Sequence, residues 1–187
     1  MDALAGGPDV PVAKAAAREQ ILRQRRALSP EQREGIAAAL VEAVRTLRPN
    51  RIAAYVSIGT EPPTGPLLAA FEGVLLPVLL PDGNLDWARH DGTLVPAAHG
   101  LVEPGGPRLG TAAVTRCDLV IVPALAVDRA GCRLGRGGGS YDRVLPRVTG
   151  CTLSPLYDDE LVESLPRAPH DVAVRAVVTV REGLVLF

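Results

Sequence analysis

The hydrophobic and polar positions of the first stretch with a clear pattern predict a helix over residues 12–28. This stretch is alanine-rich, and Lys14, Arg18 and Arg25 fall on one face of the helix at spacings of four and seven. The pattern alone leaves two interpretations of this basic face open. It is either a solvated stripe or part of a binding site.

A second helix is predicted over residues 30–47, where apolar residues recur at intervals of three and four and form one stripe. Its start carries several agreeing signals. Ser29 is a suitable N-cap, Pro30 suits the first turn, and Gln32 completes a capping box. We therefore expect this helix to pack against a core.

Several shorter apolar runs follow, and segments with helical character separate them. Uniformly apolar runs are typical of strands whose sheet is covered on both faces. The predicted strands are residues 51–57, 74–80, 119–122, 151–156 and 172–180, with a hairpin or edge strand over 85–94 and a loop over 100–105. Short helices are predicted near residues 67–71, 141–147 and 159–165.

This alternation predicts a single-domain, three-layer α/β/α fold whose sheet is mostly parallel with an antiparallel addition. A chain of 187 residues is long enough for one sizeable core. Residues 1–10, rich in glycine, proline and aspartate, are predicted to be disordered. Residues 11–187 are then predicted to form the one domain.

Composition and charge exclude several classes of function. The formal net charge is −1, which gives no electrostatic case for binding nucleic acid or a membrane surface. No apolar segment is long enough to span a bilayer, and the first residues lack the order of a signal peptide. We therefore expect a cytoplasmic protein. We also expect a monomer or weak homodimer that acts on a small molecule, although these observations do not themselves determine the oligomeric state.

Two rare residue types give weaker hints. Cys117, Cys132 and Cys151 are an odd set without C-x-x-C spacing, which predicts reduced thiols rather than disulfides or a zinc site. No histidine is near Cys132 in sequence, so a catalytic role is not expected for it. Lys14 is the single lysine among 20 Lys and Arg residues, a mild hint that an ammonium group is needed there.

The segment with the most chemical character joins a buried strand, a glycine-rich loop and a helix start. After the strand 119–122, Arg133 and Arg136 flank a glycine run that leads to Tyr141 and Asp142. This arrangement favours a bound phosphate for three reasons. The helix start has unpaired backbone N–H groups, the glycines let the backbone approach a phosphate closely, and the two arginines add positive charge. Asp142 is placed to hold a magnesium ion against it. The alternative is a glycine-rich surface turn with solvated arginines.

Glu61 lies in a polar loop that follows the predicted strand 51–57. In α/β sheets the carboxyl ends of the strands form the edge where ligands bind. Its carboxylate could accept hydrogen bonds from a ring N–H or an amino group. The alternative is a solvated acid on a loop.

The run from Val122 to Arg143, VPALAVDRAGCRLGRGGGSYDR, resembles the signature of the 5-formyltetrahydrofolate cyclo-ligase family, also called 5,10-methenyltetrahydrofolate synthetases. Shorter similar segments occur in the family's order at Lys14 with Arg18, residues 55–64, 100–104 and 165–179. The resemblance thus extends over nearly the whole chain.

The resemblance implies ATP- and Mg²⁺-dependent conversion of 5-formyltetrahydrofolate to 5,10-methenyltetrahydrofolate, with release of ADP and phosphate. Phosphoryl transfer would activate the formyl oxygen, and attack by N10 would then close the ring. In this reaction the protein would act mainly by positioning the substrates and neutralising their charges. The ATP-binding residues it implies are Lys14, Arg18, Arg133, Leu134, Gly135, Arg136, Gly137, Gly138, Gly139, Ser140 and Tyr141, with Arg133 and Lys14 also catalytic. It implies Glu61 and Tyr141 for the folate and Asp142 and Asp171 for Mg²⁺.

The chain departs from the family's usual pattern within two of these segments. Ser140 stands where an aromatic residue is usual, and Ala168 replaces a glutamate ahead of Pro169-His170-Asp171. These departures motivate an alternative hypothesis. The chain would then be a non-catalytic relative that binds ATP or a reduced folate as a sensor or storage module.

Overall fold

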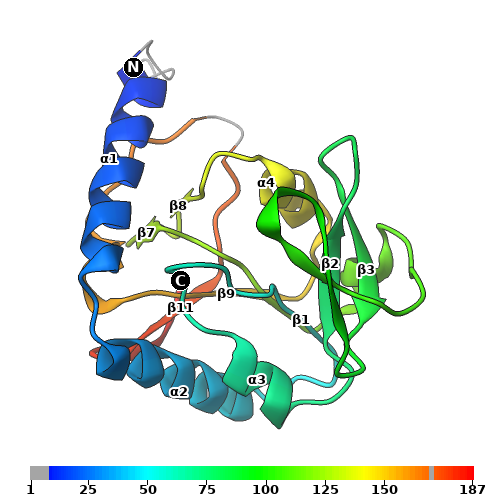
Figure 1. Cartoon of the computed structure of the whole chain (residues 1–187). Coiled ribbons are helices and arrows are strands. Elements are labelled where there is room, and N and C mark those ends of the chain that lie inside the picture. Colours follow the sequence, from blue (N-terminus) through cyan, green and yellow to red (C-terminus); the bar gives the residue numbers. More distant parts are fainter. Residues whose placement is uncertain (1–8, 169–170) are drawn as a thin grey trace.

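The computed structural model describes residues 9–168 and 171–187, and a mixed β-sheet forms its centre (Figure 1). Within the described residues, seven strands run in the order β12-β11-β9-β6-β1-β2-β3. The five inner strands are parallel to one another, whereas β12 and β3 pair antiparallel with them at the two edges. The strands are β1 Ile52–Ala53, β2 Leu75–Leu79, β3 Leu85–Arg89, β6 Leu119–Ile121, β9 Cys151–Pro155, β11 Ala176–Thr179 and β12 Gly183–Leu186. The predicted mostly parallel sheet with an antiparallel addition is confirmed.

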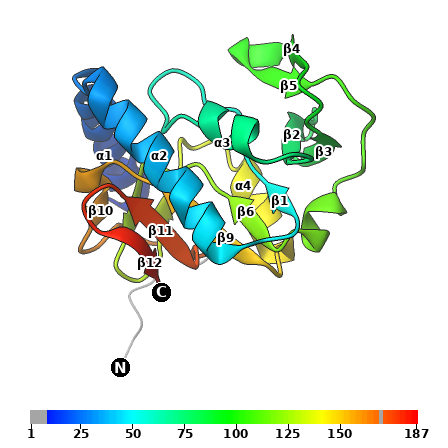
Figure 2. The ribbon, with the colours of Figure 1, turned by 90° about the horizontal axis from the view of Figure 1, so that it is seen from below.

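Helices cover both faces of this sheet, which explains why its central strands are uniformly apolar. Figure 2 shows α2 (Pro30–Leu47) crossing one face, with α3 (Gly65–Ala70) beside it. The other face packs against α4 (Ser140–Val144) and the short 3-10 helices η2 (Ala113–Arg116) and η3 (Leu145–Arg147). The three-layer prediction is therefore confirmed.

Helix α2 begins and ends where its local signals predict. The Ser29 side chain accepts a hydrogen bond from the Gln32 backbone, and the Gln32 side chain accepts one from Ser29 in return. Ile36, Leu40 and Val44 on its apolar stripe are fully buried against the sheet. Local capping and burial of one face thus agree on the position of this helix.

Helix α1 (Asp9–Arg26) packs on a second, smaller sheet rather than on the main one (Figure 1). Ala17, Ile21 and Leu22 lie against Leu125 and Leu134. The small sheet has the order β10-β7-β8, with β7 Ala126–Asp128, β8 Arg133–Leu134 and β10 Leu161–Val162. Because β8 leads directly into the glycine run, this sheet sets where that run begins.

The predicted disorder of residues 1–10 concerns mostly residues outside the described part of the chain. Helix α1 already includes Asp9 and Val10, while residues 1–8 are outside it. The predicted domain limits, 11–187, stay a prediction.

Some predicted elements differ from those observed. The segment predicted as a loop contains β5 (Val102–Pro104), which pairs with β4 (Leu94–Pro96) around η1 (Ala98–Gly100). The predicted helix over 159–165 is instead η4 (Asp158–Glu160) followed by β10. Of the last predicted strand, 172–180, only β11 (Ala176–Thr179) forms, and its antiparallel partner β12 (Gly183–Leu186) was not predicted. Each correction involves pairing between strands, which local patterns do not specify.

The cysteines agree with the predicted reduced state. Cys117, Cys132 and Cys151 are free thiols, and burial raises the pKa of Cys132, which keeps it protonated and unreactive. Across the described residues, no helix is long and apolar enough to cross a membrane. The cytoplasmic location and the monomeric or weakly dimeric state stay predictions.

We expect Gly150→Ala to destabilise the fold, because Gly150 packs directly against the backbone at the start of β6. An added Cβ would overlap the carbonyl oxygen of Cys117 and lie 2.6 Å from that of Asp118. Overpacking against backbone should lower the free energy of unfolding by about 2 kcal/mol or more. Denaturant unfolding measures this value.

The matched control is Gly105→Ala at an exposed position, where the added Cβ would meet only side chains at ordinary contact distances of 3.5 Å or more. It should change the free energy of unfolding by less than about 0.5 kcal/mol. Equal stability of the two variants would contradict the close approach at Gly150.

Candidate active site

A cavity of about 290 Å³ lies at the carboxyl ends of β1 and β6. Its walls come from segments far apart in sequence: α1, the β1–α3 loop, β2, β5, the β6–β7 connection and the glycine run before α4. This edge of a parallel sheet is where ligands bind in α/β proteins. Apolar side chains, including Val56, Leu79 and Leu101, share the walls with charged ones, as in ligand pockets generally.

The glycine loop, residues 135–139, forms one wall of the cavity. Gly137 and Gly139 adopt positive φ values of 101° and 72°, which favour glycine. A Cβ at Gly135 would lie 2.5 Å from Nη1 of Arg133, so the arginine side chain packs directly under the loop. The backbone at this wall is therefore shaped for close approach by a ligand.

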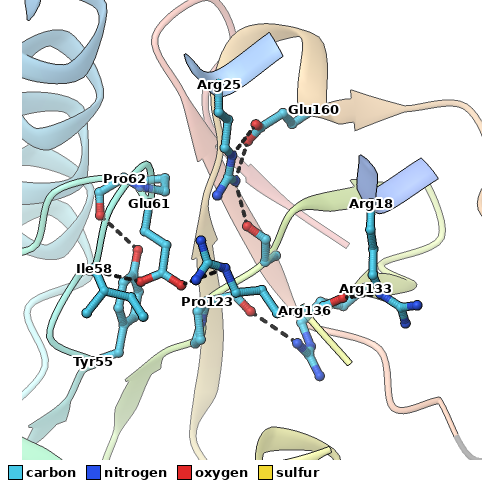
Figure 3. A network of polar contacts seen from close by, with 12 residues as sticks. Arg18, Arg25, Tyr55, Ile58, Glu61, Pro62, Pro123, Arg133, Arg136 and Glu160 are labelled. Carbon is cyan, nitrogen blue, oxygen red and sulfur yellow. Dashed lines mark hydrogen bonds and ion pairs between the residues drawn. The ribbon is translucent and has the colours of Figure 1, made fainter. Parts of the chain in front are cut away.

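Arg133 is buried beneath this loop and its guanidinium is held in place. Nη2 donates to Oδ1 of Asp142 over 2.5 Å, and Nη1 donates to the Pro123 carbonyl over 3.1 Å (Figure 3 shows the Pro123 contact). Two of the predicted site residues thus form an ion pair with each other, and Asp142 keeps about two-fifths of its side chain exposed (41%).

The basic face of α1 meets the glycine loop and the C-terminal segment. Arg18 donates from Nε to the Gly135 carbonyl over 2.8 Å, and Lys14 lies 2.5 Å from Oδ2 of Asp171. Asp171 also accepts a hydrogen bond from the backbone N–H of Ala168 over 2.7 Å. The face is therefore engaged with the site rather than solvated along its length.

Glu61 lies on the opposite wall and is nearly buried (9% exposed). Its Oε2 accepts a hydrogen bond from the Ile58 N–H over 2.9 Å, and Oε1 lies 3.4 Å from Nε of Arg136 (Figure 3). The Tyr55 hydroxyl donates to the Pro62 carbonyl over 3.0 Å and fixes the loop that carries Glu61. Burial raises the pKa of Glu61, although the Ile58 N–H and the Arg136 charge oppose this.

Three side chains of the cavity wall carry buried donors that have no partner among the described residues. They are Nη1 of Arg25, Nε of Arg133 and the hydroxyl of Tyr141. Burial, with the charge of Glu61, raises the pKa of Tyr141, so its hydroxyl keeps its proton. Because buried donors are rarely left unpaired, these groups indicate a ligand that is rich in acceptors.

Most of the site residues named from the sequence lie together in this cavity. Those that line it are Glu61, Arg133, Gly135, Arg136, Gly137, Gly138, Gly139, Ser140, Tyr141 and Asp142. Arg18 contacts the glycine loop and Lys14 contacts Asp171, but none of these three residues lines the cavity itself. The Leu134 side chain belongs to the core beneath α1, so only its backbone is available to a nucleotide.

The acids named for Mg²⁺ do not form a preformed metal cage. Among the described residues, no group of three or more potential ligands is gathered, and Asp142 and Asp171 each pair with a cation. Pro169 and His170, which precede Asp171, lie outside the described residues. Mg²⁺ usually binds one or two carboxylates together with substrate phosphates, and two separate aspartates are compatible with that mode.

Two charged residues of the cavity wall were not predicted as site residues. Arg25 is almost fully buried (1% exposed), and its only sequence signal is its place on the same helix face as Lys14 and Arg18. Glu103 accepts a hydrogen bond from the Leu79 N–H over 2.9 Å, and it lay in a segment recognised only by resemblance.

Comparison with known proteins agrees with this geometry. The profile of the 5-formyltetrahydrofolate cyclo-ligase family matches residues 10–180. The 5-formyltetrahydrofolate cyclo-ligase of Mycolicibacterium smegmatis is 40% identical over 94% of this chain and 97% of that protein, and the Escherichia coli K12 protein of the same name is 34% identical over 85% and 96%. The NMR structure of Aquifex aeolicus 5,10-methenyltetrahydrofolate synthetase superposes with a TM-score of 0.80 at 28% identity, covering 92% of each chain.

Sequence and fold thus agree over almost the full length of these relatives, and the family's glycine loop lies on the wall of the cavity. The chain belongs to the 5-formyltetrahydrofolate cyclo-ligase family.

Proposed function

We propose that this protein catalyses the ATP- and Mg²⁺-dependent conversion of 5-formyltetrahydrofolate to 5,10-methenyltetrahydrofolate, releasing ADP and phosphate. The observation that carries the proposal is one cavity that joins the glycine loop to Glu61 and is bordered by unpaired buried donors. A phosphate-binding wall facing a carboxylate suits a reaction between a nucleotide and a ring that carries N–H groups.

The reaction needs the γ-phosphoryl group of ATP on the formyl oxygen. That oxygen would attack phosphorus as ADP leaves, N10 would then attack the formyl carbon, and phosphate would depart with the oxygen. The glycine loop, Arg133 and Arg136 would bind the triphosphate, and Lys14 and Arg18 would approach it from α1. These residues act by positioning and by neutralising charge, so no covalent nucleophile is required.

The folate would bind at the opposite wall. Glu61 keeps lone pairs free after its contacts with Ile58 and Arg136, and these would accept from the ring N–H and amino group of the pterin. Tyr141 reaches the same cavity with a protonated, unpaired hydroxyl and would contact the folate there.

Asp142 and Asp171 would hold Mg²⁺, which would supply charge neutralisation at the phosphates. Their chemistry suits this ion, because Mg²⁺ prefers carboxylate oxygens. Each aspartate would then exchange the cation that it contacts now, Arg133 or Lys14, for the metal. The released cations would be free to bind phosphate oxygens.

The alternative of a non-catalytic relative has less support than catalysis. Its motivation was the change at Ser140 and Ala168. Asp171 is nevertheless held through the backbone N–H of Ala168, a contact that does not need a side chain at this position. Binding of ATP or folate that stabilises the protein without turnover would favour the alternative.

The activity itself is the first prediction. Purified protein supplied with 5-formyltetrahydrofolate, ATP and Mg²⁺ should produce the near-ultraviolet absorbance of the methenyl product, and omission of ATP should abolish the signal. No ATP-dependent product at high enzyme concentration would reject the proposed function.

Arg133→Ala should raise the KM for ATP by about 30-fold, which corresponds to about 2 kcal/mol for hydrogen bonds to a charged group. Steady-state kinetics at saturating folate measures this value. Arg143→Ala is the matched control, because Arg143 is an exposed arginine beside the same loop and donates only over 3.4 Å to Gly83. Unchanged ATP dependence of a folded Arg133→Ala protein would show that Arg133 does not bind the nucleotide.

Folate affinity should depend on pH through Glu61. The ionised carboxylate is the form that accepts hydrogen bonds, so affinity is full above its pKa and is lost as the pH falls through it. Because burial raises this pKa, the loss should begin above the value of about 4.3 of an ordinary glutamate. Binding titrations from neutral to acidic pH follow the change.

Glu61→Gln should weaken folate binding at neutral pH and remove the acid-dependent step. The control is Glu163→Gln, since that side chain is 91% exposed and does not line the cavity. An acid-dependent step that survives in Glu61→Gln would assign it to another group.

A further inference from the structure

Arg25 crosses from α1 into the main cavity and is the most completely buried cation of the described structure (1% exposed). Its Nε donates to Oε1 of Glu160 over 2.6 Å, and its Nη2 donates to Oε2 of Glu160 over 2.8 Å and to the Ala124 carbonyl over 2.7 Å. Its guanidinium carbon also lies 5.5 Å from the centre of the Tyr157 ring. The guanidinium is therefore fixed on one side.

The other side of the guanidinium is unsatisfied. Nη1 carries two N–H donors, is buried, and has no partner within the described part of the chain. In Figure 3 this nitrogen is turned away from Glu160, toward the side of the cavity where Glu61 lies. The charge of Arg25 also acts to lower the pKa of Glu61, which agrees with their proximity. A buried donor that shares a cavity with Glu61 needs an acceptor that the described residues do not supply.

The ligand of the proposed function has such an acceptor next to the groups that Glu61 would bind, and this step rests on that function. Along one edge of the pterin, the 2-amino group, N3–H and the 4-oxo group follow one another. A carboxylate can accept from the first two but not from the third, because the third is itself an acceptor. We propose that Arg25 donates from Nη1 to the 4-oxo oxygen and thereby selects 4-oxo pterins over 4-amino pterins.

A purely structural role would account less completely for this arrangement. The bonds to Glu160 and Ala124 already fasten α1, and they leave Nη1 unused. A 4-amino group would place its N–H donors against the N–H donors of Nη1. Neither group would then have an acceptor, so the site would reject the 4-amino ligand because of unpaired polar groups and not because of its size. Arg25 is then a specificity-determining residue.

The test compares the binding of 5-formyltetrahydrofolate and its 4-amino analogue by calorimetry and by turnover kinetics. The wild type should prefer the 4-oxo compound by about 10-fold or more, the size expected for a hydrogen bond to a charged group. Arg25→Lys keeps a cation for Glu160 but removes Nη1. It should raise the KM for 5-formyltetrahydrofolate by about 10- to 100-fold, leave the KM for ATP within about twofold and lose the preference.

Two controls separate donation from support of the fold. Arg26→Lys makes the same change at the next position, which is exposed, and should alter nothing. Glu160→Gln weakens the ion pair but leaves Nη1 in place, so it should lower the unfolding temperature and keep the 4-oxo preference. Loss of the preference in Glu160→Gln as well as in Arg25→Lys would favour a structural role and overturn the proposal.

The remaining outcomes are also decisive. Equal affinity of the wild type for both ligands, or an Arg25→Lys effect confined to ATP, would overturn the assignment while the turnover assay still supports the proposed function. If Arg25→Lys does not fold, the preference of the wild type and its retention in Glu160→Gln decide the matter. A wild type that binds no folate rejects the proposed function and this inference together.

Discussion

The site depends first on the buried ion pair that fastens helix α1 to the segment after β9. Arg25 and Glu160 make two hydrogen bonds to each other where both side chains are shielded from water. Removing one partner of such a pair leaves an uncompensated buried charge, at a cost of about 3–5 kcal/mol. The pair is therefore a strong constraint on the position of α1. Because Lys14 and Arg18 lie on the same helix face, that constraint also places Arg18 against the glycine loop and Lys14 against Asp171.

Around the cavity, the acids and bases named for ligand binding neutralise one another. Lys14 contacts Asp171, Arg133 contacts Asp142, and Arg136 lies near Glu61. Under the proposed function, ATP and Mg²⁺ separate the first two pairs together, since phosphates take the cations while the metal takes the carboxylates. Either ligand alone would break each of these ion pairs while replacing the contact of only one of its two members. Under the proposed function, the charges of the protein itself would therefore couple the binding of nucleotide to the binding of metal.

The parts of the fold that were predictable are those specified by neighbouring residues. Helix α2 begins at Pro30 and ends at Leu47 as predicted, because its cap and its apolar stripe are local features. Strand β1 keeps only two of its predicted residues, since the chain beyond Ala53 leaves the ladder to form the cavity wall. The β7–β8 hairpin was missed because its stability depends on α1 and on β10, which are distant in sequence. Strand pairing of this kind depends on context more than on propensity.

The same distinction between local and distant contacts separates the predictable parts of the site from the rest. The glycine loop and its arginines form one continuous segment, whereas Arg25 and Glu160 are 135 positions apart and no spacing rule connects them. The departure at Ala168 shows the converse, because the contact at this position comes from the backbone and not from the side chain. Ala168 holds Asp171 through its backbone N–H, which every residue except proline provides. Loss of the usual glutamate there leaves this contact intact, so the substitution alone does not argue against an active enzyme.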